Sequence, residues 1–512
     1  MLENPLEITK SFQIHNSKDR KIFRFFETIP GLLSWLTLFL AFWLSRTTPI
    51  LVAFFIIVFD IVWLLRVFYL SFYQIASFRK LQKNLTINWL EKLQKDCPDS
   101  WSSIYHLITL PTYKEGLEII DASCHALESC LYPKDKMIVV LAIEERGGEE
   151  AQKIAKQVQD KYGKRFFRFL VTVHPKDIEG EIAGKGSNVS WALQKTKEII
   201  IDPLKIPYRN ILISNFDIDT KPYPHYFSIL TWNYLKVEFP LRSSYQPIPI
   251  YNNNIWDSPA FSRIIASSGT FWQMMQQERQ EQLVTYSSHS FPFIVFVDIG
   301  YPSKIVSDDS HIFWKAYLFY QGNYRVVPLY YPVSMDAVMA KSLWLTIVNQ
   351  YKQQRRWAWG SENIPYLFYN FFKDKKLALK EKIRHSFILI EGFWSWSVSA
   401  LLIFFLGWLP IFLGGEKFHN NLLFYNLPRL TSNLMTISMF GMVISAGMSF
   451  LLLPPRPIGY GRIRNLSMFL QWLLLPVTLI LFGSFPALDA QTKLMLGKEL
   501  GFWPTAKTHR SR

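Results

Sequence analysis

Five long stretches with almost no charged side chains, two near the start of the chain and three near its end, constrain the fold more than any other feature. They cover residues 28–45, 47–65, 392–415, 430–455 and 465–488, and Asp60 is the only charged residue within them. A helix rises about 1.5 Å per residue and the hydrocarbon core of a bilayer is about 30 Å thick, so each stretch is long enough to cross it. The alternative is a set of helices buried in a protein core. We expect a multi-pass membrane protein.

Composition agrees with this expectation. Of the 512 residues, 49% are hydrophobic and 19% are charged, which is below the usual quarter. The net charge of +16 favours an anionic partner, such as lipid headgroups or nucleotide phosphates. No nucleic-acid reader motif is recognisable, so we expect no nucleic-acid partner. The three cysteines, Cys97, Cys124 and Cys130, lack metal-site spacing and indicate a reducing compartment without disulfides.

The distribution of basic residues predicts the topology. Segment 1–27 is polar for too long to be a cleaved signal. Lys and Arg cluster before the first stretch, after the second ("FRKLQKN") and between the fourth and fifth ("RPIGYGRIR"), which places these regions in the cytoplasm. Five full crossings would leave the basic tail outside. Either the tail breaks the rule or 465–488, with Pro476 and Pro486, is re-entrant or interfacial.

The middle of the chain alternates between short apolar runs and helical patterns. Strands are expected within 105–116, 136–148, 167–175 and 210–224, with helices between them over 117–131, 149–163 and 185–200. Such alternation predicts an α/β domain with a mostly parallel sheet and helices on both faces. Ligands bind at the carboxyl ends of such strands, so the polar residues that follow them should converge.

The expected organisation has six parts. They are a cytoplasmic N-terminal segment (1–27), a two-helix transmembrane hairpin (28–77), a cytoplasmic α/β domain (100–335), interfacial helices (336–385), a C-terminal transmembrane region of about three segments (386–488) and a basic tail (489–512).

Two pairs of acids are candidates for chemistry. Asp217 and Asp219 follow the fourth strand, and residues i and i+2 of an extended chain point to the same side. Their oxygens suit Mg²⁺ or Mn²⁺, although an isolated Asp-x-Asp is a common pattern. Asp308 and Asp309 begin an apolar helical pattern, which fits helix capping and a general base equally well.

Two basic positions complete the set. Lys185, followed by Gly186 and Ser187, opens a helix, where backbone N–H groups and an ammonium would favour a diphosphate; a plain helix start with a solvated lysine fits the sequence equally well. The helical segment "LWLTIVNQYKQQRRWAWG" (343–360) ends in arginines and tryptophans. An interfacial helix explains that composition, whereas the order Gln353-x-x-Arg356-Trp357 is more specific than an interfacial helix requires.

Taken in order, "LPTYKEG", the acids after the second strand, "KGSN", "DID", "SDD" and "QQRRW" resemble the motifs of membrane-bound family 2 glycosyltransferases. These enzymes are similar to cellulose, chitin and hyaluronan synthases, and the resemblance covers roughly residues 30–510. It implies a Rossmann-like GT-A domain with a mostly parallel sheet, inserted between transmembrane helices of the cell membrane. It also implies transfer of a sugar from a nucleotide sugar, with Mg²⁺ or Mn²⁺.

The resemblance implies a role for each matching residue. Thr112, Tyr113 and Glu115 match the nucleoside-binding motif. Glu144 or Glu145 stands where relatives carry Asp near the uracil, which leaves the choice of uridine open. Lys185 and Asn188 match the diphosphate-binding segment, and Asp217 and Asp219 match the pair that binds the metal and the diphosphate. The corresponding residues of the sequence are Thr112, Tyr113, Glu115, Glu144, Glu145, Lys185, Asn188, Asp217 and Asp219.

On the acceptor side, Asp309 matches the catalytic base, with Ser307 and Asp308 replacing the usual Thr and Glu. Gln353, Arg356 and Trp357 match the motif that lines the acceptor site and holds the leaving diphosphate, whereas Arg355 and Trp359 would face the membrane interface. Attack in line by the acceptor hydroxyl would invert the anomeric carbon.

The resemblance extends to three further segments. "LGKELGFWPTAKT" is similar to a gating loop, with Thr505 and Lys507 over the nucleotide; a disordered basic tail is the alternative. Stretches 243–261 and 285–304 resemble those of a bacterial subgroup and should shape the acceptor pocket, where His289 is either a ligand-binding or a structural residue.

Three functions follow from these patterns. The first is a polymerising enzyme that feeds its glycan through the membrane part. The second is a non-processive enzyme that adds one sugar to a polyprenyl phosphate or glycolipid. The third is a transporter or an inactive scaffold, although the apolar stretches contain few charges that could line a transport pathway. The expected partners are therefore a nucleotide sugar, a glycan or lipid-linked acceptor, and membrane lipids.

Overall fold

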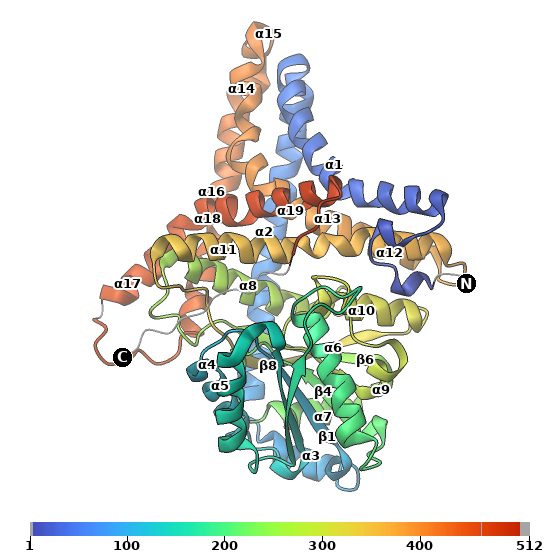
Figure 1. The fold of residues 1–512 in the computed structure, drawn as a ribbon. Coiled ribbons are helices and arrows are strands. Elements are labelled where there is room, and N and C mark those ends of the chain that lie inside the picture. The colour runs from blue at the N-terminus through green and yellow to red at the C-terminus, as the bar shows by residue number, and fades with distance from the viewer. Residues whose placement is uncertain (1–3, 462, 502–512) are drawn as a thin grey trace.

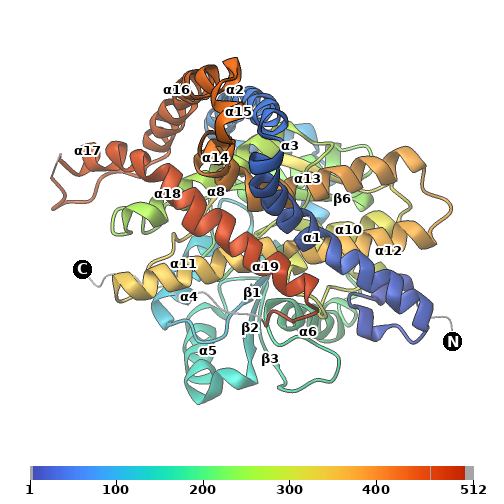
Figure 2. The same cartoon turned by 90° about the horizontal axis from the view of Figure 1, so that it is seen from above.

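The molecule has three parts along one axis (Figure 1). The computed structural model describes residues 4–461 and 463–501. An α/β domain lies at one end, long helices project from the other, and a layer of helices lies across the chain between them. Figure 2, which looks along the projection, shows that this layer extends beyond the projecting helices on both sides.

The α/β domain is built on one mixed sheet of eight strands, in the order β3-β2-β1-β4-β7-β6-β8-β5. β1 to β4 are parallel and lie where the sequence predicted strands. β7 pairs antiparallel with β4 and β6, β8 runs parallel to β6, and β5 pairs antiparallel with β8. The strands are β1 (Tyr105–Pro111), β2 (Met137–Glu144), β3 (Arg168–His174), β4 (Ile211–Asn215), β5 (Lys221–Pro222), β6 (Ser243–Ile250), β7 (Ser290–Pro292) and β8 (Arg325–Ser334).

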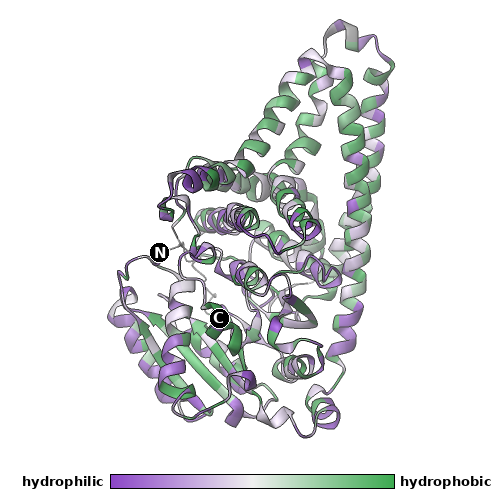
Figure 3. Cartoon of the chain, turned by 90° about the vertical axis from the view of Figure 1, so that its right-hand side faces the viewer, coloured by the Kyte–Doolittle hydropathy of each residue, from purple (hydrophilic) through white to green (hydrophobic). Residues whose placement is uncertain are grey.

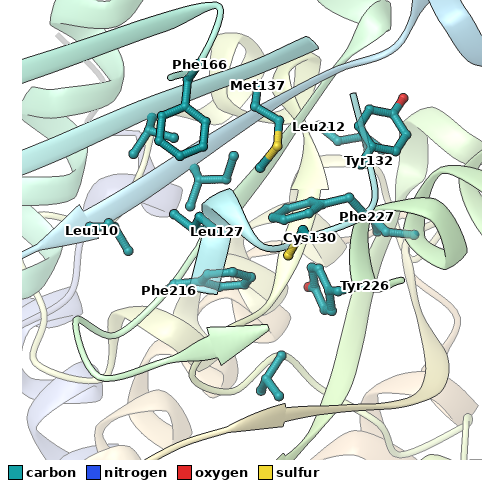
Figure 4. Packing of buried hydrophobic residues seen from close by; sticks show 14 of the residues in the cluster. Leu110, Leu127, Cys130, Tyr132, Met137, Phe166, Leu212, Phe216, Tyr226 and Phe227 are labelled. Atoms are coloured by element: carbon teal, nitrogen blue, oxygen red, sulfur yellow. The ribbon is translucent and has the colours of Figure 1, made fainter. Parts of the chain in front are cut away.

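Alternate side chains of the central strands point to opposite faces of the sheet and build two cores. Ile108 and Val139 belong to the first core, with Leu127, Cys130 and other residues shown in Figure 4. Its helices are α3 (Trp89–Asp96), α4 (Leu117–Glu128), α5 (Gly148–Tyr162) and α7 (Tyr226–Lys236). All three cysteines lie in this core.

Leu107 and Val140, from the same two strands, belong to the second core. Its helices are α6 (Lys185–Thr196), α9 (Phe293–Ile299), α10 (Asp308–Phe319) and α12 (Asn363–Lys373). Helices therefore cover both faces, as the strand-helix alternation predicted.

The layer across the molecule contains α8 (Ala260–Glu278), α11 (Leu343–Ala358) and α12 (Figure 1). α8 connects β6 with β7 and packs against β6 and α2, whereas α11 follows β8 and packs against α19. Because α8 contacts both β6 and α2, this layer connects the sheet to the long helices.

Within residues 4–461 and 463–501, five helices are long and apolar enough to cross a membrane: α1 (Ser17–Thr47), α2 (Pro49–Leu85), α13 (Leu379–Phe404), α16 (Leu422–Leu451) and the broken helix Ile463–Met495. Large apolar side chains on these helices are exposed, as Phe72 is to 69% and Leu65 to 62%. Figure 3 shows that the projecting helices are mainly apolar along their length, with hydrophilic residues at the tip. Lipid would cover these side chains, so the chain has the character of a membrane protein.

The helices extend beyond the apolar stretches from which the sequence predicted them. α2 continues into the α/β domain, where Asn84 donates to the main-chain oxygens of Leu329 and Tyr330. At the tip of the projection, α14 (Leu409–Leu413) and α15 (Gly415–His419) connect α13 to α16.

The fifth candidate span is interrupted. It consists of α17 (Ile463–Leu470), α18 (Leu475–Leu479) and α19 (Phe485–Met495), with Pro476 and Pro486 in the first turns of the last two. α18 and α19 run across the direction of α2 (Figures 1 and 2). Gln491 of α19 accepts a hydrogen bond from Ser34 at 2.7 Å, which fixes α19 to α1.

Candidate active site

A cavity of about 1790 Å³ begins at the carboxyl ends of β1, β2 and β4 and continues among α2, α13, α16 and α18. It contains most of the residues that the sequence singled out. After the roles that the sequence resemblance implies, we call the part beside the parallel strands the donor side and the part beside α10 and α11 the acceptor side.

Lys185 lies at the junction of the two sides. Its Nζ is 2.7 Å from Asp217 Oδ1 and 2.9 Å from Asp309 Oδ1. Burial alone would lower the pKa of Lys185, but the carboxylates of Asp217, Asp309 and Asp308 raise it above its ordinary value. The lysine therefore stays charged and joins a candidate metal ligand to the candidate base.

The glycine after Lys185 has a packing reason. A Cβ on Gly186 would lie 2.4 Å from the main-chain oxygen of Pro302 and 3.1 Å from Cβ of Asp308. The start of α6 therefore approaches the loop before α10 at a distance that a larger residue would not allow.

Asp217 and Asp219 both line the cavity. Ser287 Oγ donates to Asp217 Oδ2 at 2.5 Å, and the N–H of Asp336 donates to Asp219 Oδ2 at 2.8 Å. Among the residues that the structure describes, no group of three or more His, Cys, Asp or Glu is arranged to hold a metal. Two carboxylates still fit Mg²⁺ or Mn²⁺, because such ions commonly complete their shell with water and substrate phosphates.

One end of the cavity is lined by Thr112, Tyr113, Glu115 and Glu144, which match the nucleoside-binding residues of the resemblance. Glu115 Oε2 accepts from Thr112 Oγ1 and from the N–H of Tyr113, each at 2.7 Å, so this carboxylate organises its own loop. Glu144 forms an ion pair with Arg146, whose guanidinium carbon is 4.7 Å from the centre of the Tyr113 ring.

Two residues predicted to bind the donor are used differently. Glu145 is not among the residues that line the cavity; its carboxylate accepts from the N–H of Lys176 at 3.0 Å, so the choice between the two acids favours Glu144. Asn188 lines the cavity, and its Nδ2 donates to the main-chain oxygen of Ala142 at 2.7 Å, which ties α6 to β2.

The adjacent acids at the start of α10 lie in different environments. Asp309 is 21% exposed and contacts Lys185. Asp308 is 2% exposed and accepts from Tyr301 Oη at 3.1 Å. Burial, followed by the charge of Asp309, raises the pKa of Asp308 to about 7. The geometry favours Asp309 over Asp308 as the base.

The end of α11 also has two faces. Gln353, Arg356 and Trp357 line the cavity, and the ring of Tyr251 lies 6.3 Å from that of Trp357. Arg355 instead pairs with Asp489 of α19 at 2.8 Å. The expectation that Trp359 faces the membrane interface is wrong: it is 3% exposed and donates to Glu362, because the chain turns into the protein after α11.

His289 has a structural environment. It is fully buried, its Nδ1 lies 2.9 Å from the main-chain oxygen of Tyr286, and it is not among the cavity-lining residues. Burial lowers the pKa of His289 to about 4, so the ring is neutral. Its Nδ1 also lies 3.6 Å from Asp309 Oδ1, so the buried ring packs behind the candidate base without lining the cavity, which is closer to the structural alternative.

Several residues of the site carry no sequence motif. Ser287, Asp336 and Tyr301 orient the acids, Tyr251 adds an aromatic ring to the acceptor side, and Glu362 holds the loop before α10. The first four lie in or beside stretches 243–261, 285–304 and the end of β8, where position between the motifs was the only signal. Thr505 and Lys507 lie outside the described residues.

Comparison with known proteins gives only distant likenesses. No protein-family model and no curated protein matches the sequence. A mannosyltransferase from Pyrobaculum calidifontis, in complex with GDP-Man and Mn²⁺, is 13% identical, with a TM-score of 0.43; the match covers 87% of this chain and all of the other. Residues 1–349 of S. aureus TarS, in complex with UDP-GlcNAc, are 11% identical, with a TM-score of 0.35, over 77% and 93% of the two chains.

Proposed function

We propose that this protein is a membrane glycosyltransferase of the GT-A fold and of the family 2 type, which transfers a sugar from a nucleotide sugar with inversion. A UDP-sugar is the first donor to test. The observation that carries the proposal is the contact of Lys185 with both Asp217 and Asp309 in one cavity. It brings groups suited to a diphosphate next to a carboxylate suited to accept a proton.

The reaction uses these groups as follows. The acceptor hydroxyl attacks the anomeric carbon from the face opposite the diphosphate, and its proton passes to Asp309. The bond between the anomeric carbon and the diphosphate oxygen breaks, and Lys185 and Arg356 stabilise the charge on the leaving group. Asp217 and Asp219 would hold Mg²⁺ or Mn²⁺, which neutralises diphosphate charge when it is bound. Trp357 offers a flat apolar face to a sugar ring.

The acceptor is expected to approach from the membrane side, because the cavity continues between the long helices. Its walls there combine apolar side chains with Ser395, Ser399 and Thr436, and with the ion pair of Arg66 and Glu391. This lining suits either a glycan chain or the head of a lipid-linked acceptor. Processive synthesis and single transfer to a polyprenyl phosphate or glycolipid therefore both remain candidates.

We place the α/β domain in the cytoplasm, inserted between transmembrane helices of the cell membrane. The transverse direction of α18 and α19 supports an interfacial position for 463–495. The N-terminal segment and the tail would then lie on the same side, in agreement with their basic residues. A tail that closes over the nucleotide through Thr505 and Lys507 requires this arrangement.

The test is a panel of UDP- and GDP-sugars incubated with the purified protein in detergent and Mn²⁺ or Mg²⁺. Release of nucleoside diphosphate, abolished by chelation, is expected for at least one donor. A labelled product that forms a ladder supports polymerisation, and a single shifted product supports one transfer. No turnover of any nucleotide sugar, with lipid extract present as acceptor, would contradict the proposal and favour an inactive scaffold.

A further inference from the structure

A buried carboxylate connects the two acceptor-side motifs. Glu362 follows α11, in the 3-10 turn Trp359–Glu362, and is 4% exposed. Its Oε1 accepts from the N–H of Ser307 and from Ser307 Oγ, each at 2.8 Å, and from the N–H of Val306 at 3.1 Å. Its Oε2 accepts from Trp359 Nε1 at 2.8 Å.

These hydrogen bonds act against the cost of burying the carboxylate. Burial raises the pKa of Glu362 to about 7, whereas the hydrogen bonds from Ser307 and Trp359 and the charge of Lys10 act to lower it. A buried carboxylate with several such partners is costly to disturb, because removing it leaves each donor without an acceptor. The arrangement is therefore rigid.

The contacts of Glu362 fall on the segment that carries the base. Residues 301–307 form an irregular loop between α9 and α10, and Asp309 comes two residues after Ser307. Ser307 is the N-cap residue of α10, yet its hydroxyl makes no capping bond and points to Glu362 instead. The loop has no strand or helix of its own to fix it, so Glu362 supplies the acceptor that its amides need.

Asn363 reinforces the same connection. Its Nδ2 is 3.0 Å from Ser307 Oγ and 3.1 Å from Ser310 Oγ, and its Oδ1 is 2.9 Å from His311 Nδ1. The segment after α11 therefore holds both the loop before α10 and the first turn of α10.

We propose that Glu362 is a positioning residue, which sets the place of Asp309 relative to Arg356 and Trp357 without touching the substrate. The inference rests on the proposed function of the site, and it assigns to Glu362 the alignment of the base with the acceptor. A misplacement of about 1 Å in such a site reduces the rate by about 10²-fold. Donor binding should depend little on Glu362, because the donor-side groups have other partners.

The two oxygens of Glu362 suggest a decisive set of variants. In Glu362→Gln one oxygen still accepts from the loop, but the new NH₂ group then faces the N–H of Trp359. Trp359→Phe removes that opposing donor. We expect Glu362→Gln to lower kcat about 30-fold and to leave the donor KM unchanged within about twofold. The double variant Glu362→Gln/Trp359→Phe should recover most of the lost kcat. Glu362→Ala should lower kcat at least as much as Glu362→Gln, and adding Trp359→Phe should not restore it.

The measurements are nucleoside diphosphate release over the same sugar-nucleotide panel, thermal unfolding, and hydrogen exchange of peptides that contain Val306 and Ser307. Asn370→Ala is the control, because this buried amide of α12 bonds to Pro5 and Tyr366 and does not reach the loop. It is expected to leave kcat and exchange in the loop unchanged.

Faster exchange of the loop in Glu362→Gln, reversed in the double variant together with kcat, would support the proposal. Unchanged exchange, or a double variant no better than Glu362→Gln, would overturn it. The hydrogen-exchange measurement does not depend on catalytic turnover. If the wild-type protein released no nucleotide, the proposed function would fail, while exchange would still decide whether Glu362 fixes the loop.

Discussion

The donor and acceptor sides of the cavity are built in different ways. On the donor side, Thr112 and Asp217 follow β1 and β4, Glu144 ends β2, and Lys185 starts α6. Each of these residues begins, ends or closely follows a strand or helix, which sets the position of its backbone. On the acceptor side, Asp309 and Trp357 come from α10 and α11, and buried hydrogen bonds between distant segments hold these elements together.

The two sides also depend on each other. Asp217 and Asp219 on the donor side are oriented by segments next to β7 and β8, the strands that precede and follow α10 in the chain. Ser287, which contacts Asp217, precedes β7, and Asp336, which contacts Asp219, follows β8. Lys185 connects the sides directly. The comparison therefore predicts that donor-side changes abolish nucleotide chemistry, acceptor-side changes uncouple it from transfer, and changes at their junction have intermediate effects.

The largest effect is expected for Asp219→Ala. This change removes one of the two carboxylates suited to the ion, so nucleoside diphosphate release should fall by about 10⁴-fold, since metal stabilisation of the leaving group contributes several kcal/mol. Chelation of the wild-type protein should have the same result. Asp202→Ala, an exposed acid that pairs with Lys197, is the control. Release above one tenth of the wild-type rate would contradict the role of Asp219.

Asp309→Asn should separate the two sides. Transfer to the acceptor is expected to fall by about 10²–10³-fold, because the hydroxyl loses its general base. Nucleotide binding in the presence of Mn²⁺, measured by calorimetry, should stay within about threefold, because the binding groups of the donor side remain. A loss of nucleotide binding as large as that in Asp219→Ala would show that Asp309 serves the donor instead.

A smaller effect is expected where the loop before β7 supports the donor-side carboxylate of Asp217. Ser287→Ala removes the hydroxyl that donates to Asp217, and loss of such an outer partner weakens metal binding by about tenfold. The Mn²⁺ concentration needed for half-maximal release should rise accordingly. Ser288→Ala is the matched control, because its hydroxyl bonds to Thr220. Equal Mn²⁺ requirements for the two variants would argue against the dependence of one side on the other.

The same contrast explains what the sequence could predict. The parallel strands and the residues at their ends were predictable, because strand-helix alternation and short apolar runs are local patterns that determine local structure. Lys185 and Asp217 were found in this way. Ser287, Asp336 and Glu362 were missed, because a hydrogen bond between segments far apart leaves no periodic signal in either one.

Trp359 shows the limit most clearly. The aromatic side chain of Trp359 and its place beside Arg355 and Trp357 indicated the membrane interface. In the structure the turn after α11 carries the residue into the protein, where its indole N–H donates to the carboxylate of Glu362. The broken helix 463–495 is a similar case. Hydropathy indicates a span, whereas its direction depends on packing against α1 and α11.

The smallest effect is expected at Asp308, and it concerns stability. Burial and the neighbouring Asp309 raise the pKa of Asp308 to about 7, whereas an unfolded Asp titrates near 4. Between these values the folded state binds more protons than the unfolded state, so the free energy of unfolding falls as the pH rises, and the loss is complete above pH 7. Asp308→Asn cannot ionise and still offers an oxygen to Tyr301.

Asp308→Asn should therefore stabilise the protein relative to the wild type by about 1–2 kcal/mol at pH 8 and by less at pH 5, as measured by thermal unfolding in detergent. Asp121→Asn provides a control of opposite sign. Although burial raises the pKa of Asp121, hydrogen bonds from Lys161 and Tyr162 hold it below its ordinary value, so this variant should be less stable than the wild type at pH 8. A destabilised Asp308→Asn at pH 8 would mean that the folded protein favours the ionised form of Asp308, so that its pKa is not raised. Asp308 would then be a carboxylate over the same pH range as Asp309, and the preference for Asp309 as the base would lose this support.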